Sequence, residues 1–351
     1  MRHCGMGSFA ADFRQFTGAD APEGLSPQLE HYWDLKVSEL ATLHEPGPGP
    51  EDQERHRIFA LMLMGLVHEY WNGNKNGRAG RYPWNEENLS VGPHLDEDYK
   101  GHNIAAIAVN SDGIILDFDF NHNRLFNSSA EHAEARLVRR IFGLAQLADT
   151  WRPAVDGQCL PHSALSDYTT LADITIYTSL ESCAQCAGVM ALGRVRQVVY
   201  LQTDPGMYFI GRILRNLTDE NLRAPLPISG GEIGLPYFAE LDAAAGAFAR
   251  QVPNEPFWIE HQPNGAVRRD TSQSVTSFLC TKNARDIYGD GRERFKELLD
   301  GRRELEFPEY RPTNADATRS KTVRSNQEVV TEAADFLAYA ITSGRRATPH
   351  H

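Results

Sequence analysis

The stretch Ile176–Met190, which reads IYTSLESCAQCAGVM, decides the fold of this chain. It begins inside an apolar strand expected over residues 174–180 and ends inside a helix expected over residues 183–193. A further strand is expected over residues 197–201, after a short connection. A strand, a helix and a second strand joined by short loops are typical of a parallel pair in an α/β sheet.

Upstream of this unit, the sequence predicts a β-hairpin and a long helix. Apolar residues 103–109 and 114–120 flank an Asn-Ser-Asp-Gly turn, which is a strong hairpin signal. The second strand alternates apolar and polar residues, so we expect one buried face, with Leu116, Phe118 and Phe120, and one solvated face, with Asp117, Asp119 and Asn121. A helix is expected over residues 131–148, where apolar residues recur at helical spacing.

The composition is that of an ordinary globular protein, with 351 residues, 41% hydrophobic residues and a formal net charge of −12. The longest apolar run, Ile58–Val67, is too short for a membrane span, and the first residues do not resemble a signal peptide. Five cysteines are too few for a disulfide framework. We therefore expect a cytoplasmic protein that does not bind a membrane. The acidic balance also weighs against a protein that coats nucleic acid.

A run of alternating proline and glycine at residues 46–50 marks a boundary in the chain. We expect an N-terminal extension over residues 1–50, a core over residues 51–215 and a helical C-terminal extension over residues 216–351. Helices are expected within the last segment at residues 240–251, 284–299 and 327–342.

Two short motifs carry metal-binding chemistry, and each lies where a strand is followed by a helix. His132-Ala133-Glu134 opens the first expected helix, and Cys183 and Cys186 open the second. Both positions fall on the same edge of the predicted sheet, where open α/β sheets place their sites. The two cysteines are three residues apart, so their sulfurs share one face of a helical turn whose positive end favours thiolates.

This set of residues suits zinc. His132, Cys183 and Cys186 would supply three ligands, which leaves the fourth tetrahedral position for water, as in catalytic zinc sites. Bound zinc lowers the pKa of water from 15.7 to about 7. Glu134 would take a proton from that water and deliver it to a leaving amine. We therefore predict Zn²⁺ as the cofactor and Glu134 as the catalytic residue.

The pattern H-x-E followed by C-x-x-C resembles the signature of the zinc-dependent cytidine/deoxycytidylate deaminase superfamily. Ile176–Met190 and Gly193–Tyr200 with Asp204 are similar to its TadA-like branch, which contains tRNA adenosine, guanine and cytosine deaminases. The resemblance covers roughly residues 52–210. It implies a cytidine deaminase-like fold: a three-layer α/β/α sandwich around a mixed sheet of about five strands, here with N- and C-terminal additions. It also implies that Asn123, followed by Arg124, binds the base.

The chain departs from the family pattern at several places. Ser182 stands where the family has proline, and we expect Ser182 to cap the N-terminus of the helix that follows. Insertions at about residues 72–101, expected as a mobile polar loop, and at residues 149–170 would reshape the substrate mouth. Asn121 lies two residues from Asn123 with the same side-chain direction, so it is an alternative for the substrate-binding role.

The sequence leaves several substrate classes open. The leading interpretation is a zinc-dependent hydrolytic deaminase of an aminated nucleobase or nucleoside. A small molecule is favoured by the net charge of −12, and a purine is slightly favoured by the resemblance. The alternatives are deamination of adenosine or cytidine in RNA or single-stranded DNA, and a non-catalytic zinc-binding protein on the same fold. A homodimer is a further expectation from the family.

Other residue groups carry less specific signals. The aromatic residues Trp71, Tyr82, Trp84 and Phe209 either stack on a base or, more commonly in such contexts, pack in the core. The three arginines Arg136, Arg139 and Arg140 are expected on a solvated helix face. Cys159 and His162, in the second insertion, are expected not to form a second metal site.

Overall fold

The computed structural model describes residues 32, 35–85, 99–147, 170–218, 223–310 and 323–342, with backbone only over residues 143–147. Cys159, His162 and most of both predicted insertions lie outside the described residues. No described helix is long and apolar enough to cross a membrane.

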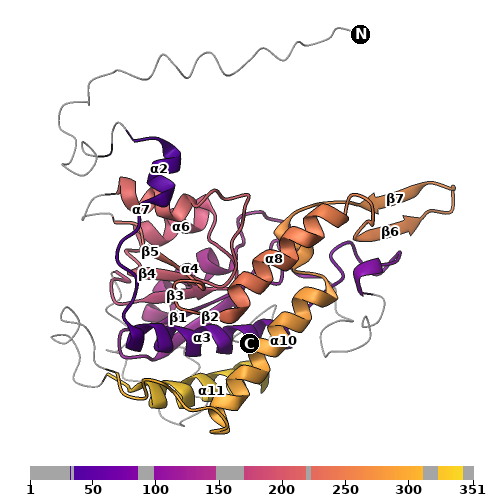
Figure 1. Ribbon diagram of the computed structural model, residues 1–351. Helices are drawn as coiled ribbons and strands as arrows, with labels where there is room; N and C mark the ends of the chain where they lie inside the picture. Colours follow the sequence, from indigo (N-terminus) through magenta and orange to yellow (C-terminus); the bar gives the residue numbers. More distant parts are fainter. Residues whose placement is uncertain are drawn as a thin grey trace.

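A five-stranded mixed sheet forms the centre of the fold (Figure 1). Its order is β2-β1-β3-β4-β5; β1 runs antiparallel to β2 and β3, whereas β3, β4 and β5 are parallel. The strands are β1 (Ala105–Val109), β2 (Ile115–Phe120), β3 (Thr175–Thr178), β4 (Gln197–Tyr200) and β5 (Leu226–Ser229). The predicted α/β class with a mixed sheet of about five strands is therefore confirmed.

Helices flank the sheet (Figure 1). On one side α4 packs against β1 and β2, α6 packs against α4, and α7 packs against β5. On the other side α3 contacts β1 and β3, and it is covered in turn by α10 and α11. The helices are α2 (Val37–Thr42), α3 (Pro50–Glu69), α4 (Ala133–Leu147), α6 (Ala184–Leu192), α7 (Ile210–Leu217), α8 (Pro236–Gln251), α9 (Val275–Phe278), α10 (Lys282–Leu299) and α11 (Asn326–Thr342).

Helix α3 is buried on nearly all sides. Pro50 is the first helical residue, a position where its missing N–H is not needed. Glu51 and Asp52 follow in the first turn, where negative charges interact favourably with the positive end of the helix dipole. Residues 58–67 are all buried, because the sheet covers one side of α3 and the C-terminal helices cover the other. The approach of α10 is close: a Cβ atom at Gly291 would lie 2.5 Å from the sulfur of Met64.

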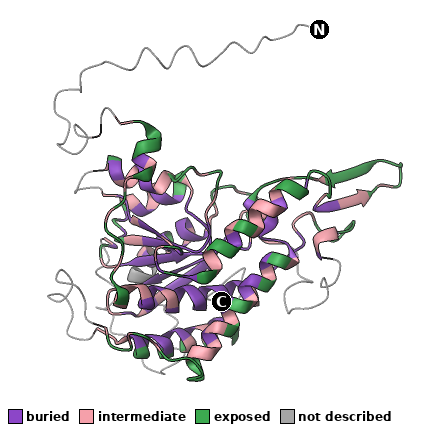
Figure 2. Cartoon of the chain, in the orientation of Figure 1, coloured by how far each residue is buried: buried purple, intermediate pink, exposed green. Residues whose placement is uncertain are grey.

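The segment after residue 215 contributes to the same core. The fifth strand, β5, lies beyond the boundary that the sequence indicates there, because a four-residue strand containing a proline gives little periodic signal. The predicted C-terminal helices correspond to α8, α10 and α11, and their buried side chains belong to one cluster with the sheet. A hairpin of β6 (Trp258–His261) and β7 (Val267–Asp270), which the sequence did not indicate, projects from this region and is largely exposed (Figure 2).

One sequence prediction about solvent exposure is wrong, and part of the expected mobile loop is packed. Asp117, Asp119 and Asn121 are buried rather than solvated, because α4 covers the polar face of β2. The expected mobile polar loop begins as a packed segment: Tyr82 is buried, and its hydroxyl donates a hydrogen bond to the carbonyl of Gly77 at 2.5 Å. Trp71 and Tyr82 are therefore core residues.

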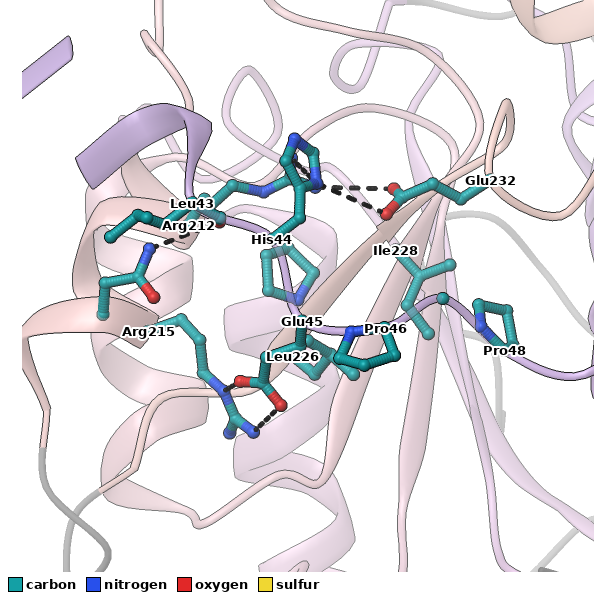
Figure 3. A pocket seen from close by; sticks show the side chains of 13 residues that line it. Leu43, His44, Glu45, Pro46, Pro48, Arg212, Arg215, Leu226, Ile228 and Glu232 are labelled. Carbon is teal, nitrogen blue, oxygen red and sulfur yellow. Dashed lines mark hydrogen bonds and ion pairs between the residues drawn. The ribbon is translucent and has the colours of Figure 1, made fainter. Parts of the chain in front are cut away.

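The segment before α3 is fastened by charged contacts to α7 (Figure 3) and to the loop that precedes β5. The carboxylate of Glu45 accepts hydrogen bonds from Arg215 at 2.6 and 3.1 Å, and from Arg223 at 3.1 Å. These contacts hold the Pro-Gly segment along the edge of the sheet that ends with β5.

Burial of His56 in α3 predicts a loss of stability in mild acid. The ring lies 2.8 Å from the hydroxyl of Tyr177, and burial lowers the pKa of His56 from about 6.5 to about 3. Between those values the unfolded chain takes up a proton that the folded chain does not, so stability falls as the pH drops below 6.5. From pH 7 to pH 5 this residue alone should cost about 2 kcal/mol.

Urea unfolding at the two pH values would measure this effect. The variant His56→Gln should lose about 2 kcal/mol less than the parent protein over that interval. The matched control His261→Gln, at an exposed position of β6, should behave like the parent protein. An unchanged pH dependence in His56→Gln would show that His56 is not the neutral buried group described above.

Candidate active site

The three predicted ligands meet where two helices begin. His132 directly precedes α4, Cys183 is the N-cap residue of α6, and Cys186 lies in the first turn of α6. The Nδ1 atom of His132 is 3.3 Å from the sulfur of Cys183 and 3.6 Å from that of Cys186. One ligand atom from each of the three residues lies within 4.8 Å of the other two, so the cluster could hold a metal ion.

Backbone and side-chain contacts bring these two helix starts together. The carbonyl of His132 accepts the first helical hydrogen bond of α4, from the amide of Arg136 at 3.0 Å. The side chain of Gln185, in the first turn of α6, donates to the carbonyl of Ala130 at 2.9 Å. Because α4 and α6 also pack along their lengths, the imidazole and the two thiols are held on a rigid frame.

The electrostatics of the cluster favour a thiolate. Hydrogen bonds from Cys186 and His132 lower the pKa of Cys183 to about 4, and its position at a helix start acts in the same direction. The same contact with Cys183 raises the pKa of His132. The pKa of Cys186 is raised by its hydrogen bond to Cys183 and by burial, so one proton is shared within the pair. Two cysteine sulfurs and an imidazole nitrogen in contact are donor types that zinc prefers, and zinc binds cysteine as the thiolate.

Glu134 lies beside the cluster and is buried from solvent. Its Oε2 atom is 3.5 Å from the sulfur of Cys186, and its Oε1 atom accepts a hydrogen bond from the hydroxyl of Ser182 at 3.0 Å. Burial raises the pKa of this carboxyl group. The prediction that Ser182 caps α6 is wrong, because the helix begins one residue later, with Cys183 as its N-cap. Ser182 instead orients Glu134.

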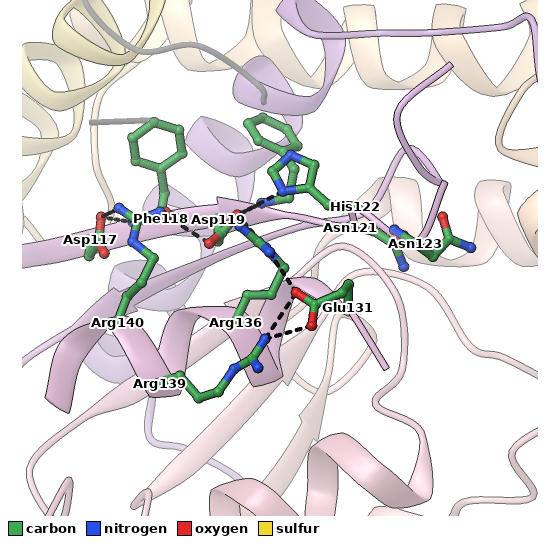
Figure 4. Close-up of polar contacts among 11 residues, drawn as sticks. Asp117, Phe118, Asp119, Asn121, His122, Asn123, Glu131, Arg136, Arg139 and Arg140 are labelled. Carbon is green, nitrogen blue, oxygen red and sulfur yellow. Dashed lines mark hydrogen bonds and ion pairs between the residues drawn. The ribbon is translucent and has the colours of Figure 1, made fainter. Parts of the chain in front are cut away.

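The arginines of α4 are bound to buried carboxylates, so the predicted solvated helix face is wrong for two of the three (Figure 4). Arg140 contacts Asp117 at 2.9 Å and Asp119 at 3.1 Å, and Arg136 contacts Asp119 at 3.1 Å. Burial raises the pKa of both aspartates, although Arg140 favours their ionised forms. Only Arg139, whose side chain is 60% exposed, fits the prediction.

This ion-pair network reaches the metal-binding cluster through Arg136. The guanidinium of Arg136 binds Asp119 on β2 and also Glu131 at 2.6 Å, and Glu131 directly precedes His132. The network therefore fixes the start of α4, with Glu134 in its first turn and His132 directly before it, against the sheet. The alternation of Asp117 and Asp119 with phenylalanines was visible in the sequence, but nothing in it indicated which helix would cover them.

The two asparagines after β2 have different environments. Asn121 is buried, and its side-chain oxygen accepts a hydrogen bond from the backbone of Asn123 at 3.1 Å, so it has a structural role. The side-chain amide of Asn123 lies 3.0 Å from Nε2 of His102, while its buried oxygen has no hydrogen-bond partner among the described residues. Asn123 lines a solvent-open hollow, and the described residues that line it do not include His132, Cys183 or Cys186.

A loop after β4 also borders the cluster. The amide of Asp204 donates to Glu181 at 3.1 Å, and burial raises the pKa of Asp204, with the nearby charge of Cys183 contributing. Further along this loop Tyr208 and Phe209 have left-handed backbone angles, with φ of 51° and 56°. Their side chains are 76% and 44% exposed. Such backbone strain in bulky residues is concentrated at functional sites. The sequence drew attention to Phe209 but not to Tyr208.

Comparison with known proteins identifies similar structures. No known family and no curated protein matches the sequence. Two solved deaminases resemble the chain. One is a tRNA:A34 deaminase from a study of A-to-I editing at the wobble position of transfer RNA, 24% identical over 36% of this chain and 82% of that chain, with a TM-score of 0.26. The other is guanine deaminase from Nitrosomonas europaea, 18% identical over 62% of this chain and 94% of that chain, also with a TM-score of 0.26. At such low sequence identities and TM-scores, the chemistry of this chain must be argued from its own site residues.

The ion-pair network predicts unequal effects for two neighbouring arginines. Arg140→Met should lower the free energy of unfolding by about 3–5 kcal/mol, because it leaves two buried carboxylates without their shared cation. Arg139→Met should cost less than about 1 kcal/mol, because the side chain is mostly exposed. Denaturant unfolding of both variants measures the difference. Equal and small losses would mean that Asp117 and Asp119 are neutral or solvated in the folded protein.

Proposed function

We propose that this chain is a zinc-dependent hydrolytic deaminase that acts on an amine-bearing nucleobase or nucleoside. The observation that carries the proposal is the buried carboxylate of Glu134 beside a cluster of one imidazole and two thiols. A structural zinc site has four protein ligands, whereas three ligands and an adjacent carboxylate are characteristic of a catalytic one. The net charge of −12 favours a small substrate over an extended nucleic-acid surface.

In this proposal His132, Cys183 and Cys186 hold the metal. When bound, zinc activates a water molecule as a nucleophile at neutral pH. Glu134 would accept a proton from the attacking water and transfer it to the amine nitrogen of the substrate. Water adds to the amine-bearing ring carbon, the carbon–nitrogen bond breaks, and the products are ammonia and the corresponding carbonyl compound. Ser182 keeps the carboxyl of Glu134 oriented through its 3.0 Å hydrogen bond.

Asn123 is the proposed substrate-binding residue. Its side-chain oxygen lacks a partner among the described residues, so it can accept a hydrogen bond from a ligand. The side-chain nitrogen of Asn123 lies 3.0 Å from Nε2 of His102, and this contact orients the amide group. These contacts support Asn123 over Asn121, whose side-chain oxygen is already bonded to the backbone.

Ammonia release by the purified zinc-loaded protein tests the proposed activity. The panel contains adenine, guanine and cytosine, their nucleosides and nucleotides, and single-stranded RNA and DNA. Release from a small molecule is the expected result. Release from polynucleotides alone would reject the small-molecule assignment, and no release from any compound would favour a binding role.

Glu134→Gln should lower kcat by about 10²–10⁴-fold, which is the usual contribution of a general acid–base group. Glutamine can still accept the hydrogen bond from Ser182, so folding and zinc content should stay close to those of the parent protein. The measurements are steady-state kinetics on the substrate found above and metal analysis. Retention of full activity would reject the proton-transfer role.

Cys186→Ala should reduce the zinc content to near background, because it removes one of three ligands. The matched control is Cys280→Ala, another buried cysteine that is not part of the cluster. That control should keep its zinc. Equal zinc content in the two variants, measured by metal analysis after dialysis, would reject the ligand assignment.

A further inference from the structure

A solvent-open hollow of about 390 Å³ lies along the loop that joins β2 to α4. Three separate parts of the chain form its wall: the segment after α3, the segment before β1, and the loop itself. The described residues that line it are Lys75, Asn76, Tyr99, His102, Asn123, Arg124, Asn127, Ser128 and Ser129.

The charge of this hollow is opposite to that of the whole chain. The chain has 47 acidic and 35 basic residues, yet among the described residues that line the hollow none is acidic and two are cations. Lys75 is held in place, since its ammonium group donates to the hydroxyl of Ser277 at 2.6 Å. Arg124 is exposed, and its side chain forms no ion pair with any residue that the structure describes. Hydroxyl groups, amide groups and the imidazole of His102 supply the rest of the described wall.

The hollow is next to the metal-binding cluster along the chain. Ser129 lines the hollow and precedes His132 by three residues, so their Cα atoms are at most about 11 Å apart. The connecting loop is a compact unit: the amide of Ser128 donates to the carbonyl of Asn123, and the amide of His122 donates to that of Glu131, both at 2.9 Å. The hollow is therefore close enough to the cluster for a ligand held there to extend into it.

We propose that the hollow binds a phosphate group of the substrate, with Arg124 and Lys75 as the anion-binding residues. This inference rests on the proposed deaminase chemistry and changes its substrate: the amine-bearing base belongs to a nucleotide unit rather than to a free base or nucleoside. Arginine in particular presents a fork of donors that matches phosphate oxygens. The phosphate comes either from a mononucleotide or from the backbone of a single strand, and these two sources share the same chemistry at Arg124.

Equilibrium binding tests the proposal without requiring turnover. The host is the full zinc-loaded chain carrying Glu134→Gln. The probes are adenosine, guanosine and cytidine, their 5′-monophosphates, inorganic phosphate, and a short single-stranded RNA and DNA. At least one phosphate-bearing probe should bind about tenfold or more tightly than its nucleoside. Arg124→Gln should remove most of this difference, whereas Arg124→Lys should keep part of it.

Arg269→Gln is the matched control, because Arg269 is an exposed arginine on β7 that does not line the hollow. It should leave the preference for phosphate unchanged. Equal binding of nucleosides and nucleotides, or an equal effect of Arg124→Gln and Arg269→Gln, would overturn the proposal.

The salt dependence of binding separates the two phosphate sources. A strand that contacts several phosphates would give a logarithmic slope of about −0.7 for each one, whereas a mononucleotide would give a slope near that for a single contact. Either slope supports the anion site, provided that Arg124→Gln reduces it. Ammonia release remains a separate measurement: its absence would reject the deaminase assignment, while an Arg124-dependent preference for phosphate would still support the hollow.

Discussion

Two buried carboxylates on β2 must be neutralised, and α4 supplies the cations that do so. Asp117 and Asp119 are fully buried, and a charge in such a place is strongly unfavourable unless it is paired. Arg136 and Arg140, one helical turn apart, meet this requirement only when α4 has one particular rotation and position along the strand. The same constraint determines where the first turn of α4 lies, and therefore where His132 and Glu134 meet the cysteines of α6.

Much of the architecture was predictable because it depends on local patterns. The hairpin, the strand–helix–strand unit and the C-terminal helices each have a periodic apolar signal, and the paired motifs at two helix starts identified the cluster. What the sequence could not supply was the partner of each polar surface. The acidic face of β2 has the same alternation as a solvated strand, and the three arginines of α4 have the spacing of a solvated helix. Only the tertiary contact between them distinguishes the two cases.

Within the site, sequence reasoning also failed at single-residue boundaries. Ser182 has the chemistry of a cap, but a helix start displaced by one residue directs its hydroxyl to Glu134 instead. The choice between Asn121 and Asn123 depended on which side-chain oxygen would be hydrogen-bonded to the backbone, and the sequence does not show this. The cationic hollow has no sequence signature at all, because residues from three distant segments form it. The net charge of −12 gave no indication of the hollow, because a strongly acidic protein can still have cations clustered at one place on its surface.

The double-sided burial of α3 has a consequence for how the chain acquires its structure. Residues 58–67 are enclosed by the sheet on one side and by α10 and α11 on the other, and those helices lie more than 200 residues later. A ribosome-bound chain that has emerged only as far as the sheet would leave an apolar helix with one side uncovered. Completion of the core is therefore delayed until residues 282–342 have been synthesised. Contacts of such long sequence separation typically form late and slowly. The side of α3 that stays uncovered until then is an apolar surface of the kind that chaperones recognise.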